Sequence, residues 1–263
     1  MKIFSTKCSH YGSIAALFAA ALAVPMSASA SAVTFAQYFQ SNGAQQQWSI
    51  ATSGGTTTVT ASGAVIFQFS GVSGLPFAGP EAATFSLSAS SSSAGNCGVA
   101  CGPGDSFVQH GFAGSFAFTD AGIAPGTNLL SGVFAVTGSP STTGAQFSSS
   151  VGGSGGSFNA SATAGNLLQL VLSSGYLSFA GQTQEDASWS LSSLLPNFST
   201  GTVTAGTAFP GPQFNASGSG TFSSNPGPSA VPEPATLGVM GSGLAGMLVF
   251  LRKRKTSAAG VKA

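Results

Sequence analysis

The chain has 263 residues, of which 43% are hydrophobic and only 5% are charged, whereas charged residues make up about 25% of an ordinary soluble domain. The seven basic residues all lie near the ends, two at Lys2 and Lys7 and five between Arg252 and Lys262, so residues 31–230 hold five acids and no Lys or Arg. This distribution excludes a basic nucleic-acid-binding protein.

The first 30 residues are predicted to be a secretory signal peptide. A cationic stretch at residues 1–10 precedes an apolar run at residues 14–24 and a small-residue series that ends at Ala30. The run is too short for a membrane-spanning helix, which takes about 20 residues, and Ala28 and Ala30 supply the small side chains that signal peptidase requires. We therefore expect export through the Sec translocon and cleavage after Ala30, with a buried N-terminal helix as the alternative.

Residues 31–222 are expected to form one exported, all-β domain. In residues 84–89 the apolar side chains of Phe85, Leu87 and Ala89 alternate with Thr and Ser, which is the period of a half-buried strand. The same alternation predicts strands at residues 33–39, 65–69, 112–118, 130–136, 189–191 and 214–222. In residues 33–39 the alternation places Phe35 and Phe39 on one face. The apolar run at residues 166–173 is ambiguous and fits a strand buried on both faces.

Stretches rich in glycine and serine separate the predicted strands, at residues 53–55, 71–74, 90–95, 152–156 and 211–212. Many short strands joined by glycine turns predict an antiparallel β-sandwich or a jelly roll. Disorder is the competing interpretation of such low complexity, but 21 phenylalanines favour a packed core because disordered chains are poor in aromatic residues. Residues 223–230, which include Pro226 and Pro228, are expected to form a Pro/Ser/Gly linker.

Two cysteines remain after removal of the signal peptide, Cys97 and Cys101. Export places them in an oxidising compartment, so we expect a local disulfide that shapes a loop. A zinc site needs four ligands, and His110 is the only other soft donor in the exported chain, so neither a metal nor a cofactor is expected.

The exported chain offers few groups for catalysis. His110, with Asp105 or Asp120 and a serine, has the residue types of a hydrolase triad, but the sequence lacks a G-x-S-x-G elbow, the strand-to-helix turn that presents a nucleophilic serine. Glu185 and Asp186 are adjacent, and neighbours in a strand point to opposite faces, so they are expected to be solvated or to bind calcium weakly rather than to form a glycosidase pair. We therefore expect no catalytic residue.

The C-terminal end combines three features in order. A proline-rich motif, residues 231–234, precedes a charge-free run at residues 237–251 and a basic cluster at residues 252–255. The motif consists of Val231, Pro232, Glu233 and Pro234, and the cluster of Arg252, Lys253, Arg254 and Lys255. The run predicts a single transmembrane helix of about 22 Å, marginal for a hydrocarbon core of about 30 Å, and the positive-inside rule places residues 256–263 in the cytoplasm as a short tail.

Residues 231–255 closely resemble the PEP-CTERM sorting signal, in which Pro-Glu-Pro, an apolar span and a basic cluster are recognised by an exosortase. The resemblance implies export across the inner membrane of a Gram-negative bacterium, retention by the tail, and cleavage near Pro-Glu-Pro. Pro232, Glu233 and Pro234 carry over as the recognition element, and no catalytic residue carries over. An ordinary C-terminal anchor is the alternative.

These features favour a non-enzymatic protein of the cell surface or of an exopolysaccharide biofilm matrix. Without Lys or Arg in the body, contact with neutral sugar through Ser, Thr, Asn and aromatic side chains is the available chemistry. One alternative is a secreted hydrolase of envelope polysaccharide that uses Asp120, Glu185 or Asp186. Another is a permanent inner-membrane protein with a periplasmic sensor domain.

Overall fold

The computed structural model describes residues 32–43, 45–77, 79–98, 100–136, 145–163, 168–204, 207–211 and 213–231. The signal peptide with Ala28 and Ala30, the helix predicted at residues 237–251, the basic cluster and the tail at 256–263 lie outside these ranges. Within them, no helix has the length and apolar character needed to span a membrane.

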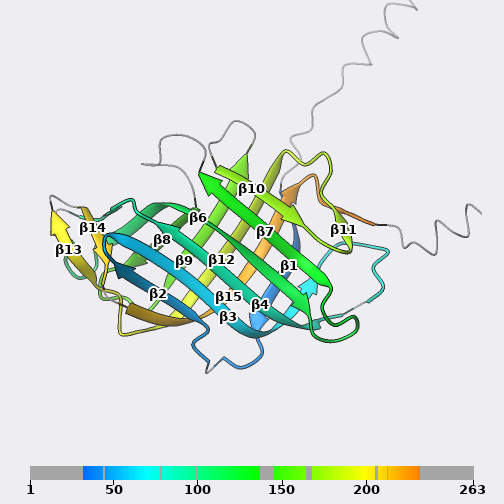
Figure 1. Cartoon of the computed structure of the whole chain (residues 1–263), viewed down its shortest axis with the longest axis horizontal. Helices are drawn as coiled ribbons and strands as arrows, with labels where there is room; N and C mark the ends of the chain where they lie inside the picture. Colours follow the sequence, from blue (N-terminus) through cyan, green and yellow to red (C-terminus); the bar gives the residue numbers. More distant parts are fainter. Residues whose placement is uncertain are drawn as a thin grey trace, which may run out of the picture. The chain divides into compact units, whose positions relative to one another are not determined.

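All regular elements of the described residues are β-strands (Figure 1). In chain order they are β1 (Val33–Gln40), β2 (Trp48–Ser53), β3 (Thr56–Phe69), β4 (Glu81–Ser91), β5 (Gly95–Asn96), β6 (Ser106–Asp120), β7 (Asn128–Val136), β8 (Ala145–Ser150), β9 (Gly156–Thr163), β10 (Leu168–Ser173), β11 (Leu177–Ser178), β12 (Gln184–Leu195), β13 (Thr200–Thr204), β14 (Thr207–Pro210), β15 (Gln213–Asn225) and β16 (Ser229–Ala230).

Fourteen of these strands form one antiparallel sheet that closes on itself. Hydrogen-bonded pairing leads from β1 through β15, β12 and β9 to β8. From β8 it continues through β6, β4 and β3 back to β1. The all-β, antiparallel prediction is confirmed, but the finer expectation of a sandwich or jelly roll differs from the structure, because these strands make one closed path rather than two separate sheets.

The remaining strands extend this path or lie at its ends. β2 pairs with β3 and β15 beyond the end of β1, and β7 pairs with β6 and β10. Figure 1 shows β13 and β14 at one end of the sheet and β11 at the other. β11 pairs with β16 in a separate two-stranded ladder.

The inside of the closed sheet is filled by aromatic rings. Side chains along β4 alternate between buried and exposed at every position, as the period of two requires. The largest fully buried residues include Trp48, Trp189, Tyr38 and Phe118, and their rings contact neighbours from several strands, as in the Trp48–Trp189 pair with centroids 6.2 Å apart. The phenylalanines therefore form a packed core, as their number predicts.

Glycines on the strands make room for these rings. A Cβ on Gly220 of β15 would lie 2.7 Å from Tyr38 Cε1 and 2.9 Å from both Trp189 Cδ1 and the Ser188 carbonyl oxygen. A Cβ on Gly132 would likewise collide with the Phe116 ring, and a Cβ on Gly218 with the Trp48 ring. The high glycine content is thus explained by ring packing inside strands as well as by turns.

The alternation in β1 differs from the expectation. A β-bulge between Thr34 and Ala36 shifts the register against β15, and a shift of one residue sends all later side chains to the other face. Phe35 is buried, but Tyr38 rather than Phe39 points inward, and Phe39 is 45% exposed. The prediction that Phe35 and Phe39 share a face is therefore wrong.

The ambiguous run at residues 166–173 contains β10. The stretch expected as a linker, residues 223–230, is largely part of the fold: residues 223–225 complete β15, and residues 229–230 form β16. The Ser224 side chain is buried and its Oγ donates to the Pro226 carbonyl, at 3.0 Å.

Gly220→Ala should destabilise the body by about 1–3 kcal/mol, because the added methyl meets two buried rings and a backbone oxygen that cannot all move aside. Urea unfolding followed by tryptophan fluorescence measures the loss. Gly79→Ala is the matched control, since nothing lies within 4 Å of its Cβ position, and equal stability of the two variants would contradict the packing argument.

Candidate functional site

The C-terminal motif begins at a residue that is fixed to the folded body. Leu177 of β11 pairs with Ala230 of β16, and Ser178 pairs with Ser229. The Val231 N–H then donates to the Tyr176 carbonyl oxygen at 2.8 Å. Pro232, Glu233 and Pro234 follow directly and lie outside the described residues, so no free spacer precedes the motif.

Aromatic packing supports this attachment. The Tyr176 ring meets the edge of Phe77 with centroids 5.0 Å apart, and Phe77 stacks on Phe69 at 5.7 Å. Phe69 is the last residue of β3 and pairs with Ala36 of β1. The strand that carries the motif is therefore coupled, through three rings, to the closed sheet.

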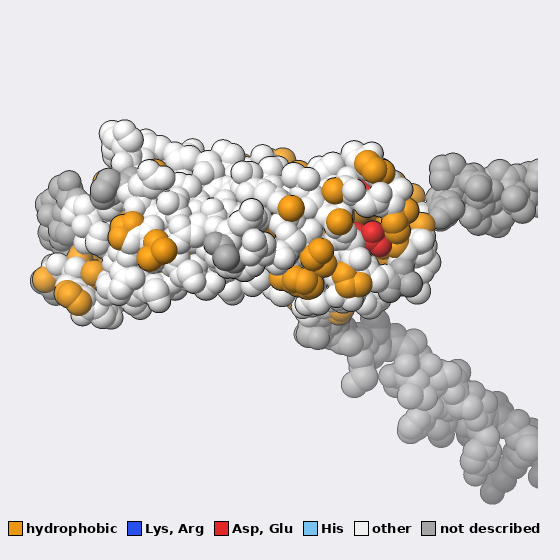
Figure 2. Space-filling view, turned by 90° about the horizontal axis from the view of Figure 1, so that it is seen from below, with side chains coloured by type: hydrophobic (Ala, Val, Ile, Leu, Met, Phe, Trp, Pro, Cys, Tyr) orange, Lys and Arg blue, Asp and Glu red, His pale blue; other side chains and the backbone are white. Residues whose placement is uncertain are grey.

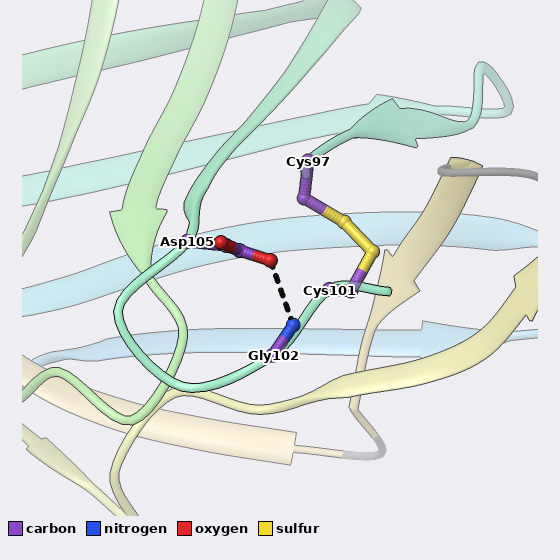
Figure 3. Close-up of a disulfide and its surroundings, with 4 residues drawn as sticks. All are labelled: Cys97, Cys101, Gly102 and Asp105. Atoms are coloured by element: carbon purple, nitrogen blue, oxygen red, sulfur yellow. Dashed lines mark hydrogen bonds between the residues drawn. A yellow bond between two sulfur atoms is a disulfide. The ribbon is translucent and has the colours of Figure 1, made fainter. Parts of the chain in front are cut away.

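Cys97 and Cys101 are joined by a disulfide in the loop between β5 and β6 (Figure 3). Their Cα atoms are 5.3 Å apart. Asp105 closes the same loop, because its Oδ2 accepts the Gly102 N–H at 2.8 Å and its own N–H donates to the Gly102 carbonyl at 3.0 Å. The Asp105 carboxylate thus has a local structural partner.

The structure does not bring His110, Asp105 and Asp120 together. Asp105 precedes β6, His110 lies within it, and Asp120 is its last residue. A strand rises about 3.3 Å per residue, and Asp105 and Asp120 flank almost the whole length of β6, so the three side chains do not share one site. His110 itself is half-buried within the strand.

Asp120 instead meets Glu81, a residue that was not among the sequence candidates. β4 and β6 pair so that Ala83 faces Asp120, and Asp120 Oδ1 and Glu81 Oε2 both lie 3.4 Å from the Cβ position of Gly122. Asp120 accepts the N–H groups of Gly122 and Ala124, at 2.6 and 2.8 Å. Glu81 has no side-chain hydrogen bond to any other described residue and is only 9% exposed.

Burial raises the pKa of Glu81, and the negative charge of Asp120 raises it further. Nothing in the sequence marks this pair, because the two residues are 39 positions apart and meet only through the register of β4 with β6. It is a carboxylate pair whose charge no basic residue of the body can balance, since residues 31–230 contain no Lys or Arg.

Glu185 and Asp186 have separate surroundings, as expected for neighbours in a strand. Asp186 accepts hydrogen bonds from Ser161 Oγ and from Gln184 Nε2, the latter at 2.8 Å. Glu185 accepts the Leu172 N–H at 3.2 Å, and burial raises its pKa despite that bond. Both residues belong to β12. The described residues contain no group of three or more His, Cys, Asp or Glu side chains placed to hold a metal ion.

The outer surface is mostly uncharged and polar. Seen from one side, hydrophobic side chains form small patches and acidic side chains show in one area near one end (Figure 2). On the outward face of β12 and β15, Ser190, Ser219 and Thr221 are exposed. This face offers hydroxyl groups rather than ionisable ones.

Removing the disulfide by Cys97→Ser with Cys101→Ser should cost only about 2 kcal/mol, since the closed loop spans a sequence separation of 4 and short loops restrict the unfolded chain least. Thermal unfolding of this variant, and of the wild type with reductant, measures the cost. Loss of cooperative unfolding on reduction would contradict a core held by aromatic packing.

Because the pKa of Glu81 is raised in the folded state, the fold is more stable with this carboxyl protonated than with it ionised. Its contribution to stability is therefore complete below its ordinary pKa of 4.5 and is lost as the pH rises through the folded-state value. Glu81→Gln should gain thermal stability relative to the wild type on going from about pH 4 to about pH 7. A difference in melting temperature that does not change with pH would contradict the raised pKa of Glu81.

Comparison with known proteins adds one finding. Residues 230–255 match the family model described as the PEP-CTERM protein-sorting motif. Comparison with curated proteins and with solved structures finds no match for the chain. The matched segment begins at Ala230, the last residue of β16. The chain thus carries a PEP-CTERM sorting signal directly behind its folded body, which identifies it as a secreted protein targeted by an exosortase, made as a membrane-anchored precursor.

Proposed function

We propose that the protein is a non-enzymatic component of the cell surface or of the exopolysaccharide matrix of a Gram-negative bacterium. In this proposal the Sec translocon exports the chain, signal peptidase cuts after Ala30, and the C-terminal tail holds the precursor in the inner membrane. The exosortase then cuts near Pro232, Glu233 and Pro234 and frees the body. The observation that carries the proposal is the sorting motif at residues 230–255.

Two features of the body support a structural rather than a catalytic role. Asp105, Asp120 and Asp186 each accept hydrogen bonds that organise a loop or join neighbouring strands. The outward face of β12 and β15 exposes Ser190, Ser219 and Thr221, and such hydroxyls suit contact with a neutral polymer more than the turnover of a substrate.

A secreted hydrolase is the second candidate, and the proximity of Glu81 to Asp120 favours it. One carboxyl with a raised pKa beside a second carboxylate is the pattern of a glycosidase acid pair. Both oxygens of Asp120 already accept backbone N–H groups, which weighs against a nucleophile. Glu81→Gln separates the candidates: a hydrolase loses its release of sugar from envelope polysaccharide, whereas a matrix protein keeps its surface localisation.

Replacing Pro232, Glu233 and Pro234 with alanine should abolish release from the membrane, because the recognition element is gone. We expect the chain in the inner-membrane fraction with residues 237–263 attached, and intact mass spectrometry of fractionated cells checks this. Alanine at Thr256 and Ser257, beyond the matched segment, is the control and should leave release unchanged. Wild-type protein recovered at the cell surface with its basic cluster still attached would overturn the proposal.

A further inference from the structure

A shallow hollow of about 290 Å³ lies on the outward face of β1, β15 and β12. The register aligns two rows of side chains across these strands. One row is Gln37, Thr221 and Ser188, and the other is Phe39, Ser219 and Ser190. Between the rows, Tyr38, Gly220 and Trp189 are buried.

The hollow results from the sizes of its side chains. On β15 and β12 the outward residues are Ser219, Thr221, Ser188 and Ser190, which are short, whereas Gln37 and Phe39 on β1 are long. The short side chains make a floor, and the long ones make one wall. Phe39 belongs to this wall only because the β-bulge between Thr34 and Ala36 turns it outward.

The floor is rich in hydroxyl groups that are available to a ligand. Ser190, Ser219 and Thr221 are exposed and make no side-chain hydrogen bond to other described residues. Each hydroxyl is both a donor and an acceptor. Ser188 is held in place, because its Oγ donates to Asn159 Oδ1 at 2.6 Å.

No charged side chain belongs to the lining of the hollow. The nearest ionisable residue along β12 is Asp186, whose two oxygens accept from Ser161 and Gln184. An anionic polymer finds no cation here, since residues 31–230 contain no Lys or Arg. The surface fits an uncharged ligand with many hydroxyls and one apolar face.

The two rows continue onto neighbouring strands. Ser188 pairs with Asn159 of β9, which pairs with Gln146 of β8, and Ser190 pairs with Ser157, which pairs with Ser148. Strands lie about 4.8 Å apart, so five strands present polar side chains over roughly 19 Å. An extended chain of several units can lie across them.

We propose that this hollow and its two polar rows bind a neutral polysaccharide chain that lies across the strands. The hydroxyls of Ser190, Ser219 and Thr221 bond to sugar hydroxyls, and the Phe39 ring packs against the C–H face of one sugar ring. This inference rests on the proposed matrix function and names its ligand class. Binding at one site is weak, because each exchanged hydrogen bond gains little over water.

The test is native affinity electrophoresis of the full chain, purified in a detergent without a sugar headgroup. Gels contain hydroxyethyl cellulose or soluble starch as neutral probes, or alginate as an anionic one. We expect retardation by a neutral polymer and none by alginate. Phe39→Ala should weaken the retardation roughly two- to tenfold, the range typical of one aromatic contact, and Ser219→Gln should weaken it by filling the floor.

Matched controls separate the hollow from general surface effects. Val133→Ala removes a side chain that is 58% exposed on β7, and Ser88→Gln makes the same change as Ser219→Gln on the outward face of β4. Both should retain wild-type retardation, and unfolding curves confirm that each variant folds.

Absence of retardation by any neutral polymer would overturn the proposal, as would equal losses in the test and control variants. So would concentration-dependent self-association that Phe39→Ala abolishes, because the face would then be an interface between copies of the chain. Sorting in cells is a separate readout. If the Phe39→Ala protein does not bind polymer but is still released from the membrane, the polysaccharide proposal fails while the role as an exosortase substrate stands.

Discussion

Packing of large aromatic rings against glycine backbone inside a closed sheet is the interaction on which the rest of the structure depends. The exported body contains no Lys or Arg with which its acids could form salt bridges. Its stability must come from apolar burial and from the hydrogen bonds of the sheet. Trp48, Tyr38 and Trp189 fit only because Gly218 and Gly220 carry no side chain.

A core of this kind leaves the outer surface free of a stabilising role. Outward positions on the strands need only to be compatible with water, and here they are mostly serine, threonine, asparagine and glutamine. Such a surface tolerates salt well, because its contacts do not depend on charge.

Much of the fold was predictable from the sequence. The period of two in residues 84–89 and 214–222 depends on local polarity alone, and both strands are present in β4 and β15. The sorting motif was recognisable because its three parts are contiguous in the chain. Closure of the sheet was not predictable, since it follows from long-range pairs such as β1 with β15. The exposure of Phe39 depends on a bulge, and the meeting of Glu81 with Asp120 depends on register, so neither leaves a local signal.

The pairing of β16 with β11 also has a consequence for the finished product. Enzymes that trim proteins from the carboxyl end need a stretch of unpaired backbone, and Ser229, Ala230 and Val231 are all bonded to the segment 176–178. A cut shortly after Val231 would leave almost no loose residues to digest. Once the tail is gone, the pairing of β16 with β11 would then protect the new C-terminus from exopeptidases.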